Sequence, residues 1–319
     1  MGTLYIDRKD LLLKLDGRSI AFYAAGQREG IVPINPLKRV IIAGDVTVET
    51  PVLHLLAREN ISVLFLSGKR LSFSGMLHGR LHNNGLLRVR QYEKSLSDFA
   101  FNAAKGLVVK KLENQISFFE DARNERPDLR LPLTDGMEKL GGIVDSVRRL
   151  EGGLDSLLGL EGGAASVYFS AFIELFPPSL EFNKRNRRPP EDPVNAMLSL
   201  CYTLLHYEMV REIQTIGLDP IIGFYHQFDY GRESLACDLV EPHRPAVDRF
   251  VWGIFREREF SARDFAEDDE RPGCYLKKQS RKRFYPMYEE WAASMRPAWR
   301  QEVRQLAKEV LDGQDPVSE

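Results

Sequence analysis

Apolar residues in the first part of the chain come in short runs, and this spacing predicts a small β-rich domain. Turn-forming pairs such as Asp16-Gly17 separate the runs, as is typical of strands joined by turns. We predict six strands, at residues 4–6, 11–15, 20–23, 39–43, 62–66 and 70–73. One helix interrupts them at residues 50–59, where Pro51 suits the first helical position. Residues 75–85 then read as a linker.

From about residue 86 onward the apolar positions recur at helical spacing, which predicts a larger all-α domain. Apolar side chains three or four positions apart lie on one face of a helix. We predict helices at residues 98–123, 136–150, 154–176, 193–216, 235–255, 276–291 and 300–311. Residues 127–132 and 177–193 read as loops, and residues 260–274 as a loop or hairpin. The predicted fold class is therefore α+β, with a β-rich domain at 1–85 followed by an α-helical domain at 86–319.

Composition and charge are those of an ordinary soluble globular protein. The chain has 319 residues, of which 43% are hydrophobic and 28% charged, and a chain of this length buries a core without disulfides. The net charge of -2 argues against a protein that coats nucleic acid non-specifically, but it is compatible with a local basic groove. Three widely spaced cysteines without a CxxC motif suit a reducing cytoplasm.

The most apolar long stretch does not predict a membrane span. Residues 194–210 are interrupted by Asn195, His206 and Glu208, so we expect a buried helix there. The first residues lack the apolar core of a signal peptide. We therefore expect a cytoplasmic protein that makes no membrane contact.

Candidate chemistry is concentrated at residues 223–229 (GFYHQFD) and 234–245 (SLACDLVEPHRP). On a helix, Asp238 and Glu241 would lie on one face, one turn apart. Carboxylates in such an apolar run are costly unless a cation compensates them, and a divalent metal or an arginine could do so. His226 precedes Asp238 by twelve positions in an aromatic setting.

Two carboxylates and one imidazole make a mixed oxygen and nitrogen site. Such a site favours Mg²⁺ or Mn²⁺ over structural zinc, and such a metal suits phosphodiester chemistry. The alternative is that the acids pair with Arg244 or Arg249, or line a solvated stripe, and that His226 is a hydrogen-bonded core residue. His243 ranks below His226 as a ligand because it follows Pro242 at a predicted helix break.

A further acid, Glu161, is flanked by small residues in an otherwise apolar helix. Small neighbours allow close approach of a ligand or of another backbone. A helix–helix contact with Glu161 at its edge explains the pattern equally well.

Two basic clusters, at residues 184–188 and 277–283, could contact phosphates. A solvated charged face is the alternative for either cluster. The candidate residues for such phosphate contacts, and hence for nucleic-acid or DNA binding, are Arg187, Arg188, Lys277, Lys278 and Arg281.

Together, four segments of the chain resemble a known family, the CRISPR-associated adaptation integrases or "Cas-one" proteins. They are residues 65–71 (FLSGKRL), 161–169 (EGGAASVYF), 186–199 (NRRPPEDPVNAMLS) and 223–245. Each segment alone is only suggestive, whereas their order and spacing over nearly the whole chain are specific to the family.

The resemblance implies a set of site residues. In the family, a glutamate, a histidine and a later acid bind one divalent metal. These positions match Glu161, His226 and Glu241, and Asp238 matches an auxiliary acid of the same catalytic set. The last ligand is Glu here where some relatives carry Asp, which changes reach but not ligand class. The expected cofactor is Mg²⁺ or Mn²⁺.

The resemblance also implies a function. The family inserts short double-stranded DNA fragments (spacers) into a CRISPR array, by attack of a 3′-hydroxyl on a phosphodiester of the repeat, and can act as an endonuclease. Its β-rich domain mediates homodimer formation, and it works with a small "Cas-two" partner in prokaryotic cytoplasm. The alternatives are a non-catalytic dimeric nucleic-acid-binding scaffold and an unrelated metallohydrolase of small phosphoesters.

Overall fold

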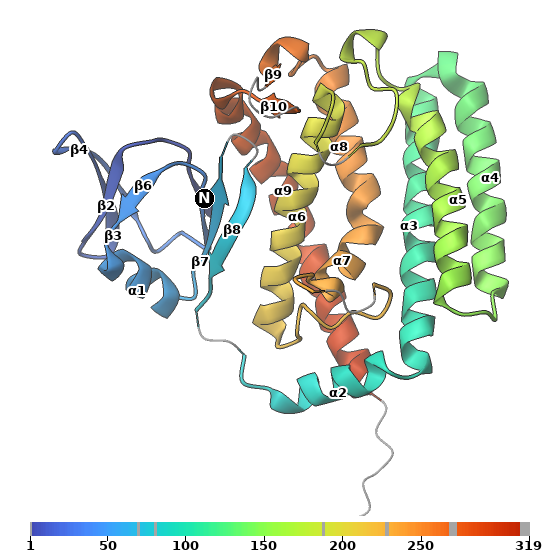
Figure 1. Ribbon diagram of the computed structural model, residues 1–319, viewed down its shortest axis with the longest axis horizontal. Helices are drawn as coiled ribbons and strands as arrows, with labels where there is room; N and C mark the ends of the chain where they lie inside the picture. Colours follow the sequence, from blue (N-terminus) through green and yellow to red (C-terminus); the bar gives the residue numbers. More distant parts are fainter. Residues whose placement is uncertain are drawn as a thin grey trace, which may run out of the picture. The chain divides into compact units, whose positions relative to one another are not determined.

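The computed structural model describes residues 2–68, 71–79, 82–186, 189–226, 230–267 and 273–312. Its internal contacts divide the chain into two compact units (Figure 1). The first unit comprises Met1–His82 together with Arg281–Glu290, and the second comprises Asn83–Ser280 together with Trp291–Glu319. The contacts thus group a late helical segment, which we had assigned to the helical domain, with the first unit.

The first unit contains two four-stranded sheets. One has the strand order β1-β5-β7-β8, in which β1, β5 and β7 are parallel and β8 is antiparallel to β7. These strands are β1 (Thr3–Ile6), β5 (Arg39–Ile42), β7 (Ser62–Ser67) and β8 (Ser72–Leu77). The other sheet has the order β4-β3-β2-β6, with β2 (Leu11–Asp16), β3 (Ser19–Ala24), β4 (Gln27–Pro33) and β6 (Val46–Val48). Helix α1 (Thr50–Arg58) separates β6 from β7 along the chain, and an apolar core that includes Ile20, Val52 and Val63 fills the unit.

Two strands of this unit were not predicted from sequence, and a third was misplaced. β4 carries the polar run Gln27, Arg28 and Glu29, all exposed, at the edge of its sheet, and β6 is only three residues long. Neither gives the apolar run on which the prediction depended. β8 occupies part of the stretch that we had interpreted as a linker.

The segment Arg281–Glu290 is held to the first unit by polar and aromatic contacts. Arg281 forms an ion pair with Asp7 at 3.3 Å, and the Tyr285 hydroxyl donates to Asp7 at 3.0 Å. Tyr5 stacks on Tyr285 with ring centroids 4.4 Å apart. These contacts explain why the segment groups with the strands.

The second unit is helical, which confirms the predicted α+β class of a strand-rich first part and a helical second part. Its helices are α2 (Gly85–Ser95), α3 (Asp98–Glu125), α4 (Arg130–Arg149), α5 (Leu154–Ile173), α6 (Pro193–Ile216), α7 (Ser234–Val240), α8 (Arg244–Arg256) and parts of α9 (Lys278–Leu311). Short 3₁₀ turns are η1 (Pro127–Leu129), η2 (Pro178–Leu180), η3 (Glu241–His243) and η4 (Ala262–Asp264). β9 (Phe265–Glu267) and β10 (Cys274–Leu276) pair as the antiparallel hairpin that was one of the two predictions for that stretch.

Local sequence signals define several of these helices. The Asp192 carboxylate accepts from the Asn195 backbone N–H at 2.8 Å and so caps α6, while Pro193 occupies the first turn. Gly217 ends the same helix with a left-handed backbone, at φ 108°. α3, α4 and α5 run side by side (Figure 1), and aromatic contacts around the buried Phe118 and Phe172 join α3 to α5.

Three helix boundaries were predicted wrongly at prolines. α4 begins at Arg130, so Pro132 lies in its first turn, where no intrahelical N–H is needed. The stretch 235–255 is divided by η3 at Pro242. Residues 276–291 and 300–311, predicted as two helices, belong to the single helix α9, which contains Pro297. Burial of Trp299, two residues after that proline, offsets the lost backbone hydrogen bond.

α5 is the one helix among the described residues that is long and apolar enough to cross a membrane by length and composition alone. It packs against α3 and α4 and carries Glu161 in an ion pair with Lys111. These contacts are those of a helix that belongs to a folded bundle.

Candidate active site

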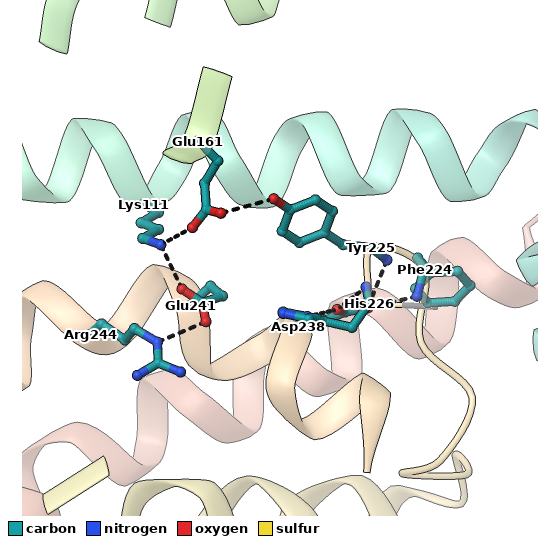
Figure 2. Close-up of polar contacts among 8 residues, drawn as sticks. All are labelled: Lys111, Glu161, Phe224, Tyr225, His226, Asp238, Glu241 and Arg244. Carbon is teal, nitrogen blue, oxygen red and sulfur yellow. Dashed lines mark hydrogen bonds and ion pairs between the residues drawn. The ribbon is translucent and has the colours of Figure 1, made fainter. Parts of the chain in front are cut away.

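Four segments of the second unit bring the predicted acids and the histidine into one region (Figure 2). Glu161 comes from α5 and Glu241 from the start of η3. Asp238 comes from α7, and His226 from the turn before it. Lys111, on α3, was not predicted from the sequence, and it lies between Glu161 and Glu241 (Figure 2).

Lys111 bridges the two glutamates. Its Nζ donates to Glu241 Oε2 at 2.7 Å and also to Glu161 Oε1. The Arg244 Nε donates to the other oxygen of Glu241, Oε1, at 2.7 Å. Only 7% of Lys111 and 6% of Glu241 are exposed, so this is a buried charge network.

The pKa values of this network favour its charged form. Burial alone would raise the pKa of Glu241, but Arg244 and Lys111 outweigh burial and lower it. Burial would lower the pKa of Lys111, but Glu241 and Glu161 raise it above its ordinary value. Both groups are therefore ionised at neutral pH.

Asp238 organises the turn that carries His226. Its Oδ2 accepts from the backbone N–H groups of Phe224 at 2.6 Å and Tyr225 at 3.0 Å. Its Oδ1 accepts from the His226 backbone N–H at 2.8 Å and lies 2.7 Å from His226 Nδ1. A carboxylate only accepts hydrogen bonds, so Nδ1 is the donor in this contact. In the neutral imidazole of this tautomer, Nε2 carries the free lone pair.

Gly223 makes this arrangement possible. A Cβ at this position would lie 2.7 Å from Asp238 Oδ2 and 2.9 Å from the Ser234 carbonyl carbon. Both distances are closer than real Cβ contacts, so only glycine allows the turn to close over the carboxylate.

Tyr225 connects the two parts of the site. Its hydroxyl donates to Glu161 Oε2 at 3.1 Å, while its backbone N–H binds Asp238. Burial and the charge of Glu161 raise the pKa of Tyr225, so the phenol stays neutral and remains a donor. Each oxygen of Glu161 therefore has a partner.

Asp238 and Glu241 bind different partners, although their helical spacing had predicted that they lie on one face of a helix. α7 ends at Val240 and the chain turns at Pro242, so Asp238 binds the 224–226 turn and Glu241 binds cations. The ion pair of Glu241 with Arg244, one of the sequence alternatives, is present. Arg249, the other arginine considered, pairs with Asp121.

The predicted basic residues have different environments. Arg187 and Arg188 lie outside the described residues. Lys278 is exposed at the start of α9, and Lys277 Nζ donates to the Arg263 carbonyl at 2.7 Å. Arg281 is buried and paired with Asp7, so its guanidinium is not available to a phosphate, and we withdraw it from the DNA-binding set.

Lys111 had a signal in the sequence that our prediction did not use. It follows Ala104 and Val108 on the buried face of α3, at helical spacing. Lysine is almost never buried without a partner, so a lysine on an apolar stripe indicates a buried acid elsewhere.

The donor chemistry fits a hard divalent cation. Glu161 and Glu241 already share one cationic group, and His226 offers Nε2; oxygen donors with one imidazole suit Mg²⁺ or Mn²⁺. Within the described part of the chain, however, no three His, Cys, Asp or Glu side chains are grouped closely enough to hold a metal. Lys111 lies between the two carboxylates instead.

Solved structures share this fold at low sequence identity. A Cas1 protein from Thermotoga maritima has a TM-score of 0.83 at 23% identity, over 100% of this chain and 99% of that one. A casposase bound to its integration product has a TM-score of 0.85 at 20% identity, over 100% and 93%. A Cas6-RT-Cas1–Cas2 complex has a TM-score of 0.82 at 23% identity, over 98% of this chain and 35% of that chain.

Sequence comparison is more specific. The family model described as "CRISPR associated protein Cas1" matches residues 4–290. The CRISPR-associated endonuclease Cas1 1 of Thermodesulfovibrio yellowstonii is 52% identical over 318 residues, which cover 100% of both chains. Since both matches extend over the strand-rich part and the helical site, the chain belongs to the CRISPR-associated Cas1 family.

Proposed function

We propose that this Cas1 protein is a divalent-metal-dependent DNA endonuclease and integrase that inserts short foreign DNA into a CRISPR array. The observation that carries the proposal is that Lys111 joins Glu161 to Glu241, while Tyr225 links Glu161 to the turn in which Asp238 holds His226. The similarity to a relative named as an endonuclease supports it.

Each protein group has a role in the proposed site. Glu161, Glu241 and His226 Nε2 would hold Mg²⁺ or Mn²⁺, which would supply charge stabilisation at the phosphate and acidify the attacking oxygen. Asp238 would orient the His226 ring, and so Nε2, through its bond to Nδ1. Arg244 would fix Glu241 through Oε1.

The proposed reaction is a transesterification. The 3′-hydroxyl oxygen of the incoming fragment forms a bond to a phosphorus of the repeat, and the bond from that phosphorus to the leaving strand breaks. The attacking hydroxyl loses its proton and the leaving oxygen gains one. With water as the nucleophile, the same exchange is hydrolysis, which is the endonuclease activity. Such transfers depend chiefly on positioning and charge stabilisation.

The proposed partners follow from the substrate and from the similar complexes. They are double-stranded DNA, a second copy of this chain and a small Cas2 protein, in prokaryotic cytoplasm. The structural similarity to a Cas1–Cas2 complex supports the Cas2 partner. Arg187, Arg188, Lys277 and Lys278 remain our candidates for phosphate contacts.

The test is strand transfer by Glu161→Gln, His226→Gln and Glu241→Gln with Mn²⁺ or Mg²⁺. We expect each variant to lose about 100-fold or more in rate, because each removes a group that acts on developing charge. Glu138→Gln and His54→Gln, at exposed positions, serve as matched controls and should keep full activity. Retained activity in all three site variants would exclude this site. Circular dichroism checks that the variants fold.

A further inference from the structure

Lys111 occupies an unusual place for a lysine. It is buried, and its ammonium is shared between two glutamates (Figure 2). The same two glutamates are the carboxylates of the proposed metal site, so this inference rests on the proposed function. A lysine ammonium is a compact charge on a flexible stem, which allows it to move without moving its helix.

Lys111 binds only two of the four carboxylate oxygens of Glu161 and Glu241, and other side chains bind the remaining two. Lys111 binds one oxygen of each glutamate, Oε1 of Glu161 and Oε2 of Glu241. The other two oxygens are bound by Tyr225 and Arg244. Departure of the ammonium would therefore free one oxygen on each carboxylate while Tyr225 and Arg244 keep both side chains in position.

We propose that Lys111 competes with the divalent metal for Glu161 and Glu241. Its ammonium neutralises the two carboxylates, which would otherwise repel one another in a buried site, and it must leave this place for a metal to take both freed oxygens. Metal and lysine are thus alternative occupants of one position, and the affinity for metal is lowered by the stability of the lysine-bridged state.

Lys111→Met tests this competition because it keeps most of the side-chain volume and removes the charge. We expect the variant to bind Mn²⁺ on the order of tenfold more tightly than the natural chain in calorimetric titration, the scale of one charge-assisted hydrogen bond. In the presence of a chelator, the unfolding temperature of the variant should be lower than that of the natural chain. Addition of Mn²⁺ should raise the unfolding temperature of the variant more than that of the natural chain.

Lys110→Met is the matched control. Lys110 is the neighbouring residue on α3 and also binds a glutamate, Glu302, outside the site. Its loss should leave Mn²⁺ affinity unchanged. Should Lys111→Met fail to fold, Lys111→Gln replaces it, because its amide still donates to the carboxylates without a charge.

The outcomes separate this inference from the proposed function. If the natural chain binds Mn²⁺ and the Lys111 variants bind it equally or more weakly, the competition is refuted and the metal site stands. If neither the natural chain nor the variants bind Mn²⁺, the proposed function and the competition both fail. Tighter binding by the Lys111 variants alone supports the competition.

Discussion

Cys237 lies directly before Asp238 on α7 and contacts His206, which belongs to α6. Burial would raise the pKa of the Cys237 thiol, but His206 and Arg232 outweigh burial and lower it. His206 Nε2 lies 3.3 Å from Glu233 Oε2. Burial lowers the pKa of His206, while Cys237 and Glu233 raise it to about 9. At neutral pH a larger fraction of Cys237 is therefore ionised to the thiolate than of a free cysteine.

We expect iodoacetamide to alkylate Cys237 before the other cysteines. Cys201 and Cys274 are buried, and burial raises the pKa of Cys274 to about 12 and that of Cys201 as well. Because the pKa of Cys237 is lowered, the alkylation rate of Cys237 should reach its half-maximum at a lower pH than that of a free cysteine. Peptide mass spectrometry over a pH series measures this midpoint.

His206→Gln tests whether His206 lowers the pKa of the Cys237 thiol. The variant removes the cation beside Cys237, so the pH midpoint of alkylation should rise and the rate at pH 7 should fall. A midpoint that does not move, or equally rapid labelling of Cys201, would contradict the assignment.

At the scale of elements, the turn before α7 can close over Asp238 only because residue 223 is a glycine. Gly223→Ala would place a Cβ 2.7 Å from Asp238 Oδ2, which forces the turn or the carboxylate to move. We expect a loss of about 1–3 kcal/mol in the free energy of unfolding, as for other overpacked positions. Mn²⁺ affinity should fall as well, because His226 loses its orientation.

Gly141→Ala is the control for the turn. A Cβ there meets nothing within 4 Å, and the residue lies inside α4, so alanine should stabilise the chain by up to about 1 kcal/mol. Chemical denaturation of both variants measures the difference. Equal stability of Gly223→Ala and the natural chain would show that the turn tolerates a side chain.

Elements were predictable where their signals are local. The prediction for α6 was correct at both ends because the Pro193 start and the Gly217 end are written in the sequence. β4 was missed because an edge strand need not be apolar. Helix α9 was divided because proline is a poor helix former, whereas burial of residues such as Trp299 decides the outcome.

The site was predictable as a set of residues but not as a set of contacts. The resemblance to the family placed Glu161, His226, Asp238 and Glu241 in one region without saying which bind one another. The Lys111 contacts join residues 50 and 130 positions apart, and no local pattern encodes such a pairing. The separate roles of Asp238 and Glu241 likewise follow from the turn at Pro242, which helical spacing ignores.

At the scale of the whole molecule, α9 contributes to both units. Arg281→Met would leave the largely buried Asp7 without its ion pair, a change that costs about 3–5 kcal/mol in comparable sites. We expect faster amide hydrogen exchange in β1 and β5, with exchange in α3 to α5 unchanged. Lys278→Met, at an exposed position of the same helix, should change neither.

The exchange pattern also tests the division into units. Equal acceleration in α3 to α5 would mean that the chain opens as one cooperative body, and the division by contacts would then have no energetic meaning.

The shared helix has a consequence for synthesis of the chain. The strands of the first unit are complete by His82, but the segment that pairs with Asp7 ends at Glu290. At about 5–20 residues per second, a ribosome needs on the order of 10–40 s to make the roughly 200 residues between them. During that interval the nascent first unit lacks the partner of Asp7. The Arg281–Asp7 ion pair can therefore form only after most of the chain has been made.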